Sequence, residues 1–149
     1  METENPKVTL SVTVWMRPTG KGRPRFKRVG NFVTTYTPAD TKKAQSVIAQ
    51  EWTQANGTVP PRCYPLRMTI KAMYKMPETW SKKKQSAFDG RYCHSYADGD
   101  NVQKLVSDAL NGIAYNDDRE IAVWVYEKQW GREDKVQITV DYEWEEERC

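Results

Sequence analysis

Four stretches of the chain have the apolar and polar patterning of strands with one buried face. They are residues 8–16, 66–76, 121–129 and 136–144, and the alternation is clearest in the second. A turn at 131–135 separates the last two stretches. We therefore expect these two to pair as an antiparallel hairpin.

A long helix is predicted over residues 38–55, where apolar residues recur at helical spacing. Thr37 is a suitable capping residue, and Pro38 is favourable at the first helical position. Gly57 is expected to end the helix.

Two further helices are predicted in the second half of the chain. A short one, rich in lysine, covers residues 79–89. The other covers 101–110, with Asp100 and Asn101 as candidate caps and Gly112 just beyond its end.

Glycines and prolines interrupt residues 17–35, which predicts a loop, and Gly30 with Asn31 suits the tip of a β-hairpin inside it. The order of elements is then strand, loop, helix, strand, two helices and two strands. This order predicts the α+β fold class, a two-layer domain in which a mixed β-sheet packs against helices. We expect residues 1–149 to form a single domain.

The composition is that of a globular chain, with 38% apolar and 29% charged residues among 149. No apolar run approaches the ~20 residues of a membrane span. Residues 1–6 are polar and unlike a signal peptide. The three cysteines are scattered and fit a reducing compartment better than a disulfide framework, so we expect a cytoplasmic location.

The net charge of +3 is unevenly distributed along the chain. Residues 17–43 hold eight Lys and Arg against one acid, whereas residues 141–147 are acidic. A basic segment near acidic residues suggests a polyanionic partner near a metal site. On charge alone, a solvated basic loop explains the pattern equally well.

The segment from residue 98 to 118 concentrates carboxylates around one lysine: Asp98, Asp100, Lys104, Asp108, Asp117 and Asp118. Lys104 and Asp108 are four residues apart, so they share one helix face, and Asp108 is expected to hold the ammonium group. Carboxylate oxygens suit a hard cation such as Mg²⁺, and the cation suits phosphate oxygens. Taken singly, these aspartates are typical of helix caps and surfaces, but their density favours a site that a cation offsets.

Three segments carry a resemblance to a known family: Asp98-x-Asp100-Asn101-x-x-Lys104-x-x-x-Asp108-Ala109-Leu110-Asn111-Gly112, Tyr115-x-Asp117-Asp118, and Gly20-Lys21-Gly22-Arg23-Pro24-Arg25-Phe26. They resemble the RusA family of Holliday junction resolvases, including its phage and prophage members, which implies a bacterial or phage-infected cell. The resemblance runs from about residue 12 to about residue 125. It implies a homodimeric, magnesium-dependent endodeoxyribonuclease that cuts four-way DNA junctions by paired symmetric nicks, with roles in DNA recombination and repair.

The resemblance also implies roles for individual residues. The implied catalytic residues are Asp98, Asp100, Lys104 and Asp118. The implied ligands of Mg²⁺, for which Mn²⁺ is expected to substitute, are Asp98, Asp100, Asp118 and Asp117. The choice between Asp117 and Asp118 stays open because the preceding segment varies in length within the family. Asn101 and Asp108 are expected to support the site.

The expected partners are junction DNA and a second copy of the chain, with no membrane and no small-molecule cofactor. The basic loop is predicted to contact DNA phosphates through Lys21, Arg23, Arg25 and Lys27. Aromatic residues near the end of the chain are candidates for the dimer face: Trp124, Tyr126, Trp130, Tyr142 and Trp144.

Two other functions remain open at this point. One is a non-catalytic nucleic-acid-binding module whose acids are structural. The other is a magnesium nuclease that acts on another branched or RNA substrate. Because acids repel nucleic acids unless a metal intervenes, the acidic cluster argues against the pure binding module.

Overall fold

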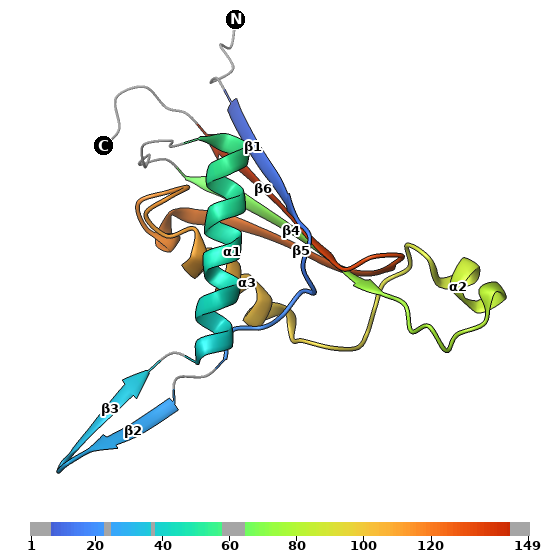
Figure 1. Cartoon of the computed structure of the whole chain (residues 1–149). Coiled ribbons are helices and arrows are strands. Elements are labelled where there is room, and N and C mark those ends of the chain that lie inside the picture. Colours follow the sequence, from blue (N-terminus) through green and yellow to red (C-terminus); the bar gives the residue numbers. More distant parts are fainter. Residues whose placement is uncertain (1–6, 23–24, 37, 58–64, 144–149) are drawn as a thin grey trace, which may run out of the picture.

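The structure, a computed structural model, describes residues 7–22, 25–36, 38–57 and 65–143. Its centre is a four-stranded sheet in the order β1-β6-β4-β5, shown in Figure 1. The strands are β1 (Lys7–Val14), β4 (Leu66–Lys75), β5 (Ile121–Gly131) and β6 (Lys135–Glu143). β4 runs parallel to β5 and antiparallel to β6, which in turn pairs antiparallel with β1. The predicted α+β class and mixed sheet are confirmed.

The predicted hairpin between the last two strands is wrong, because β4 lies between them. β4 alternates buried and more exposed residues along its whole length, and the central position gives it a partner on both edges. Residues 132–134 pass over the end of β4. There the Asp134 Oδ1 atom accepts a hydrogen bond from the Lys75 amide at 2.8 Å, and the Gly131 carbonyl accepts one from the Met76 amide at 3.0 Å.

Two helices, α1 (Ala39–Asn56) and α3 (Gly99–Ala109), cover one face of the sheet (Figure 1). Their apolar stripes meet the sheet in the main core, where Ile48 and Trp52 of α1 are fully buried. Pro38 is the N-cap of α1, not the first helical residue, and Thr37 lies outside the described residues. No helix in the described ranges is long and apolar enough to cross a membrane.

Two elements project from this body in different directions (Figure 1). One is the short helix α2 (Lys82–Phe88), which lies beyond the end of the sheet. The other is the hairpin of β2 (Arg25–Val29) and β3 (Phe32–Tyr36), which turns at Gly30 with a φ of +60° as the sequence predicts. α3 lies between them in the view of Figure 1.

The burial of aromatic residues corrects the predicted dimer face. Trp130 and Tyr142 are 4% and 1% exposed because they pack inside the chain's own core, so they are not part of a dimer surface. Tyr126 is half-buried, and its packing raises the pKa of its hydroxyl to about 12. Trp124 is exposed, whereas Trp144 lies outside the described residues.

Candidate functional site

The first turn of α3 carries the first two predicted acids. The helix begins at Gly99 with Asp98 as its N-cap, so the predicted capping by Asp100 and Asn101 is wrong. A Cβ atom on Gly99 would lie 2.7 Å from the Tyr126 ring, which means that only glycine lets this turn lie so close to β5. The early start places Asp100 inside the first turn, and both Asp98 and Asp100 are exposed.

A glycine-flanked lysine from the N-terminal loop packs against the same turn. The Lys21 amide donates a hydrogen bond to the Asn101 carbonyl at 3.0 Å. A Cβ atom on Gly20 would lie 2.9 Å from the Asn101 Cβ atom, so glycine is needed for this approach. The Gly20-Lys21-Gly22 sequence therefore brings a second lysine to the acidic segment.

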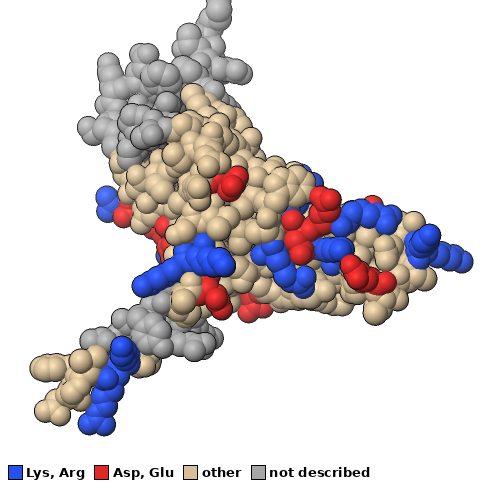
Figure 2. All heavy atoms as spheres, in the orientation of Figure 1, with Lys and Arg blue, Asp and Glu red and all other residues tan. Residues whose placement is uncertain are grey.

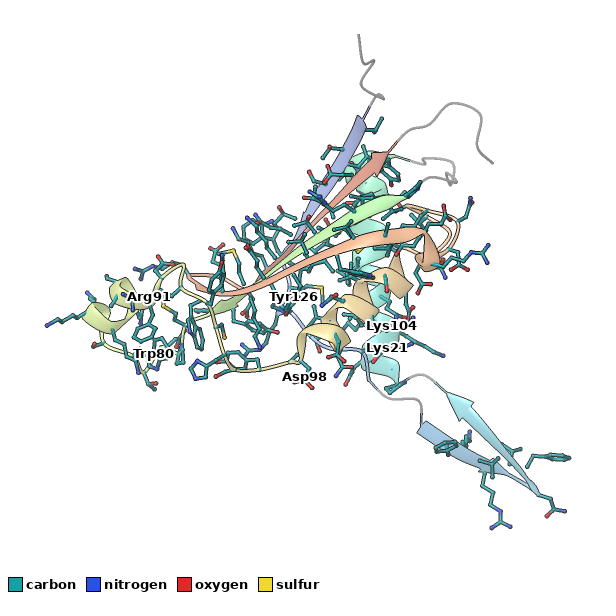
Figure 3. All side chains as sticks on the ribbon, turned by 180° about the vertical axis from the view of Figure 1, so that it is seen from behind. Lys21, Trp80, Arg91, Asp98, Lys104 and Tyr126 are labelled. Atoms are coloured by element: carbon teal, nitrogen blue, oxygen red, sulfur yellow. The ribbon has the colours of Figure 1, made fainter. Side chains whose placement is uncertain are left out.

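Lysines and carboxylates alternate in one connected chain of ion pairs. The Lys104 Nζ atom lies 3.2 Å from the Asp108 Oδ1 atom and 3.0 Å from the Asp118 Oδ2 atom. The Lys21 Nζ atom lies 2.6 Å from the Asp108 Oδ2 atom. The expected contact between Lys104 and Asp108 is present, whereas the ion pair between Lys21 and Asp108 was not predicted. The glycine neighbours of Lys21 were the only signal in the sequence. Figure 3 shows Lys21, Lys104 and Asp98 in the same region.

The ion pairs keep Lys104 charged. Hydrogen bonds from its ammonium group, first to Asp118 and then to Asp108, raise the pKa of Lys104 above its ordinary value. The side chain is nevertheless half exposed, so it remains accessible to a bound anion.

A shallow surface depression joins two of the predicted acids. It is lined by residues of α3, of the turn after it and of β5: Asp100, Gln103, Lys104, Ser107, Asp118 and Trp124. The fold thus brings Asp100 and Asp118 to one surface, as the sequence predicts, although 18 positions separate them. Asp98 and Asp117 do not line this depression.

Asp117 and Asp118 have different surroundings. Asp117 is the N-cap of a short 3₁₀ helix, η1 (Asp118–Glu120), and its Oδ1 atom accepts a hydrogen bond from the Arg119 amide at 2.9 Å. Glu120 completes a capping box by accepting from the Asp117 amide at 2.8 Å. The hydrogen bond from the Arg119 amide lowers the pKa of Asp117. Asp118 instead points its carboxylate at Lys104.

Two buried tyrosines hold the loop that returns the chain to Asp118. Tyr115 donates a hydrogen bond to the Ser107 carbonyl of α3, and Tyr142 of β6 donates one to the Ala114 carbonyl at 2.7 Å. Burial raises the pKa of Tyr115 far above its ordinary value, so its hydroxyl stays a donor. The motif in the sequence places Tyr115 beside the acidic pair, but it gives no reason to connect Tyr142 with the site.

The donor set bears on the expected metal. Within the described parts of the chain, no three His, Cys, Asp or Glu side chains gather closely enough to hold a metal ion. Asp100 and Asp118 nevertheless share one open surface. Mg²⁺ in phosphate-processing sites is commonly bound by one or two carboxylates, with water and substrate phosphate completing the shell. Asp100 and Asp118 would therefore supply two oxygen ligands to Mg²⁺, and no larger set is assembled among the described residues.

The predicted DNA-binding residues are placed unevenly. Lys21 is engaged with Asp108, and Lys27 is exposed on β2. Arg23 and the side chain of Arg25 lie outside what the structure describes. The hairpin also exposes Phe26 at 74% of its surface, so this ring does not pack on the core.

Comparison with known proteins identifies the family. The model of the family described as endodeoxyribonuclease RusA matches residues 16–141, which include the whole acidic segment and the basic loop. The chain belongs to the RusA endodeoxyribonuclease family. It is therefore a nuclease, an enzyme that hydrolyses phosphodiester bonds of DNA.

A bacterial relative extends the comparison with this RusA-family chain. The uncharacterized protein YqaN of Bacillus subtilis (strain 168) is 29% identical over 138 residues. The match covers 88% of this chain and 94% of the relative. The similarity therefore spans nearly the full length of both chains, although the name of the relative assigns no activity to it.

Proposed function

We propose that this RusA-family endodeoxyribonuclease resolves four-way DNA junctions by paired symmetric nicks in a magnesium-dependent reaction. The observation that supports this most is the shared depression of Asp100, Asp118 and Lys104. Two carboxylates beside a protonated lysine match the needs of phosphodiester hydrolysis, in which negative charge develops on the phosphate.

Nucleases of the RusA family generally need a divalent metal. Asp100 and Asp118 would hold Mg²⁺, or Mn²⁺ in its place, and Asp98 remains a predicted further ligand. When bound, the ion neutralises phosphate charge and makes water more acidic. Asp117 is the weaker candidate, because it caps η1 and does not line the depression with Asp100.

Lys104 is proposed to donate hydrogen bonds to a non-bridging oxygen of the scissile phosphate as charge develops there. Asp118 and Asp108 hold its ammonium group in place before substrate binds. Lys21 restrains Asp108 from the other side at 2.6 Å, so it acts as a positioning residue in this scheme. Lys27, Arg23 and Arg25 remain the predicted contacts to DNA phosphates, which position the substrate without reading its sequence.

Paired symmetric nicks imply a homodimer. A four-way junction has approximate two-fold symmetry, so two equivalent sites related by a two-fold axis match two equivalent strands. Among the aromatic residues predicted for the dimer face, Trp124 is the one that is both described and exposed.

The decisive experiment compares a synthetic four-way junction, a linear duplex and a single strand, each with and without Mg²⁺. We expect paired nicks in the junction only, and only with the metal. Asp100→Asn should reduce cleavage by about 10²-fold or more while the junction still binds. Even the loss of a residue that only hydrogen-bonds to a metal ligand typically lowers activity by about 10- to 100-fold. Asp40→Asn, at an exposed position on α1, is the matched control and should cut normally.

Each alternative has its own signature in this experiment. If Asp100→Asn cuts junctions at the normal rate, the depression has no part in the mechanism. Cleavage of RNA or of another branched substrate in preference to the junction would change the substrate class. Binding without any cleavage in Mg²⁺ or Mn²⁺ would indicate a nucleic-acid-binding module.

A further inference from the structure

The segment of residues 77–95, here called the α2 arm, carries unbalanced positive charge. It contains four Lys and Arg and two acids. Both acids are already paired with cations at the ends of the sheet strands: Glu78 with Lys75 at 3.0 Å and Asp89 with Arg132 at 3.3 Å. Among the described residues, no ion pair is formed by the arm's own cations, which are Lys82, Lys83, Lys84 and Arg91.

Packing does not explain the lysines of the arm's helix, because Lys82, Lys83 and Lys84 are all exposed. None of the seven residues of α2 is buried. Ser81 caps the helix by accepting a hydrogen bond from the Lys84 amide at 3.1 Å, which places Lys82, Lys83 and Lys84 together in the first turn. The helix dipole and mutual repulsion both disfavour three cations there, and α2 has no acid in that turn. An external polyanion would offset both effects.

Aromatic packing and backbone hydrogen bonds attach the α2 arm to β5. The Trp80 ring lies 4.9 Å from the Trp130 ring and 5.4 Å from the Phe88 ring, measured between centroids. Backbone hydrogen bonds join the arm to β5, among them those from the Gly90 amide to the Trp130 carbonyl at 3.0 Å and from the Trp130 amide to the Arg91 carbonyl at 2.9 Å. Anchoring lowers the entropy lost when the lysines bind a partner.

The arm and the β2–β3 hairpin lie on opposite sides of the acidic site. In Figure 3, Asp98, Lys104 and Lys21 lie between Trp80 and Arg91 of the arm and the projecting hairpin. Figure 2 shows Lys and Arg side chains on the projecting part that contains α2, with Asp and Glu side chains among them. From the arm, the chain runs directly through residues 96–97 into Asp98.

We propose that the α2 arm is a second DNA-binding surface, which binds backbone phosphates of a duplex arm on the side of the cleavage site opposite the hairpin. This inference rests on the proposed function. Lys82 and Lys83 carry it, because Lys84 lies over the Trp80 ring at 4.1 Å and also has a packing role. Phosphate contacts made through lysine position the duplex without reading its sequence, so they suit an enzyme that recognises DNA shape.

The test measures binding to the four-way junction over a series of KCl concentrations, with Ca²⁺ replacing Mg²⁺. The variant is Lys82→Gln/Lys83→Gln. The matched control is Arg67→Gln/Lys71→Gln, which removes the same charge from exposed positions on β4. We expect the variant to bind about tenfold more weakly near 0.1 M salt. The slope of log K against the logarithm of the KCl concentration should become shallower by about 1.8, since each phosphate contact contributes about 0.9. The control should match the wild-type chain in both quantities.

Two results would overturn the proposal. One is an arm variant with the same affinity and slope as the control, and the other is a wild-type chain that binds no DNA. The outcome is separable from that of the proposed function. A chain that cleaves junctions but whose arm variant behaves like the control refutes the arm alone. A chain that binds with the expected slope difference and does not cleave refutes the nuclease assignment and leaves the arm in place.

Discussion

Two adjacent aspartates show how the surroundings of a residue determine its task. Asp117 accepts a backbone hydrogen bond and caps η1, whereas Asp118 pairs with Lys104 and lines the depression with Asp100. The sequence left the choice between them open, because the segment that precedes them varies in length within the family.

Conservative substitutions separate these two tasks. Asparagine caps a helix about as well as aspartate but loses the charge, so Asp117→Asn should keep both folding stability and cleavage near wild-type levels. Asp118→Asn should reduce junction cleavage by about 10²-fold or more, because it removes a proposed ligand and a partner of Lys104. Urea unfolding and nicking rates measure the two effects. If Asp117→Asn lost cleavage activity and Asp118→Asn kept it, Asp117 would be the metal ligand and Asp118 would not.

The raised pKa of Lys104 predicts a pH dependence. The pKa of Lys104 in the folded chain is raised above the ordinary 10.5. The ion pairs of Lys104 therefore stabilise the fold fully below pH 10.5, and this stabilisation is lost as the pH rises through the pKa of the folded chain. Lys104 therefore imposes no loss of activity or stability between pH 6 and about 9. Asp118→Asn should lower the Lys104 titration midpoint, because the Asp118 hydrogen bond is the largest cause of the shift.

The measurement for Lys104 is an NMR titration of the carbon next to its ammonium group. Lys43→Gln, a change at an exposed position on α1, serves as the control and should leave the midpoint unchanged. An identical midpoint in wild-type and Asp118→Asn chains would show that the ion pair does not form in solution.

At the scale of the elements, the start of α3 depends on a side chain from the sheet. The sequence predicts a helix over 101–110, and the structure begins it at Gly99, two residues earlier. The apolar spacing inside the helix is readable from the sequence because it is local. The early start is not, because it depends on the contact with Tyr126 of β5.

Gly99→Ala tests this contact. The added methyl group meets the Tyr126 ring, so the free energy of unfolding should fall by about 1–3 kcal/mol, which is typical of overpacking. Cleavage should fall as well, because the turn carries Asp98 and Asp100. The coupling free energy between the two residues is measured by urea unfolding of Gly99→Ala, Tyr126→Val and the double variant. We expect the double variant to be less destabilised than the sum of the two single changes, and simple additivity would contradict the close contact.

The strands show the same division between local and distant information. Their positions follow from alternation, and the observed strands lie close to the predicted ranges. Their pairing does not follow, and a short connection between β5 and β6 suggested a hairpin that does not exist. β4, with buried residues at alternate positions along its whole length, takes the place between them.

At the scale of the whole molecule, the proposed reaction requires two sites. Paired nicks predict that the chain sediments at twice the 17.3 kDa of one copy at concentrations where both strands are cut. Analytical ultracentrifugation measures this mass directly, and mixing active chains with an excess of Asp100→Asn should convert paired nicks into single nicks. A monomer that still makes paired symmetric nicks would refute the dimer.

The sequence by itself determined the helices and strands, the α+β class, and the family to which the acidic motif belongs. These properties depend on periodicity, turn residues and motif spacing, which are local. Only the tertiary structure decided that β4 separates β5 from β6, that Lys21 meets Asp108, and that Asp118 rather than Asp117 joins Asp100 at one surface. Those arrangements depend on which apolar faces pack together across the chain. Packing is a property of the assembled core, so no local pattern encodes it.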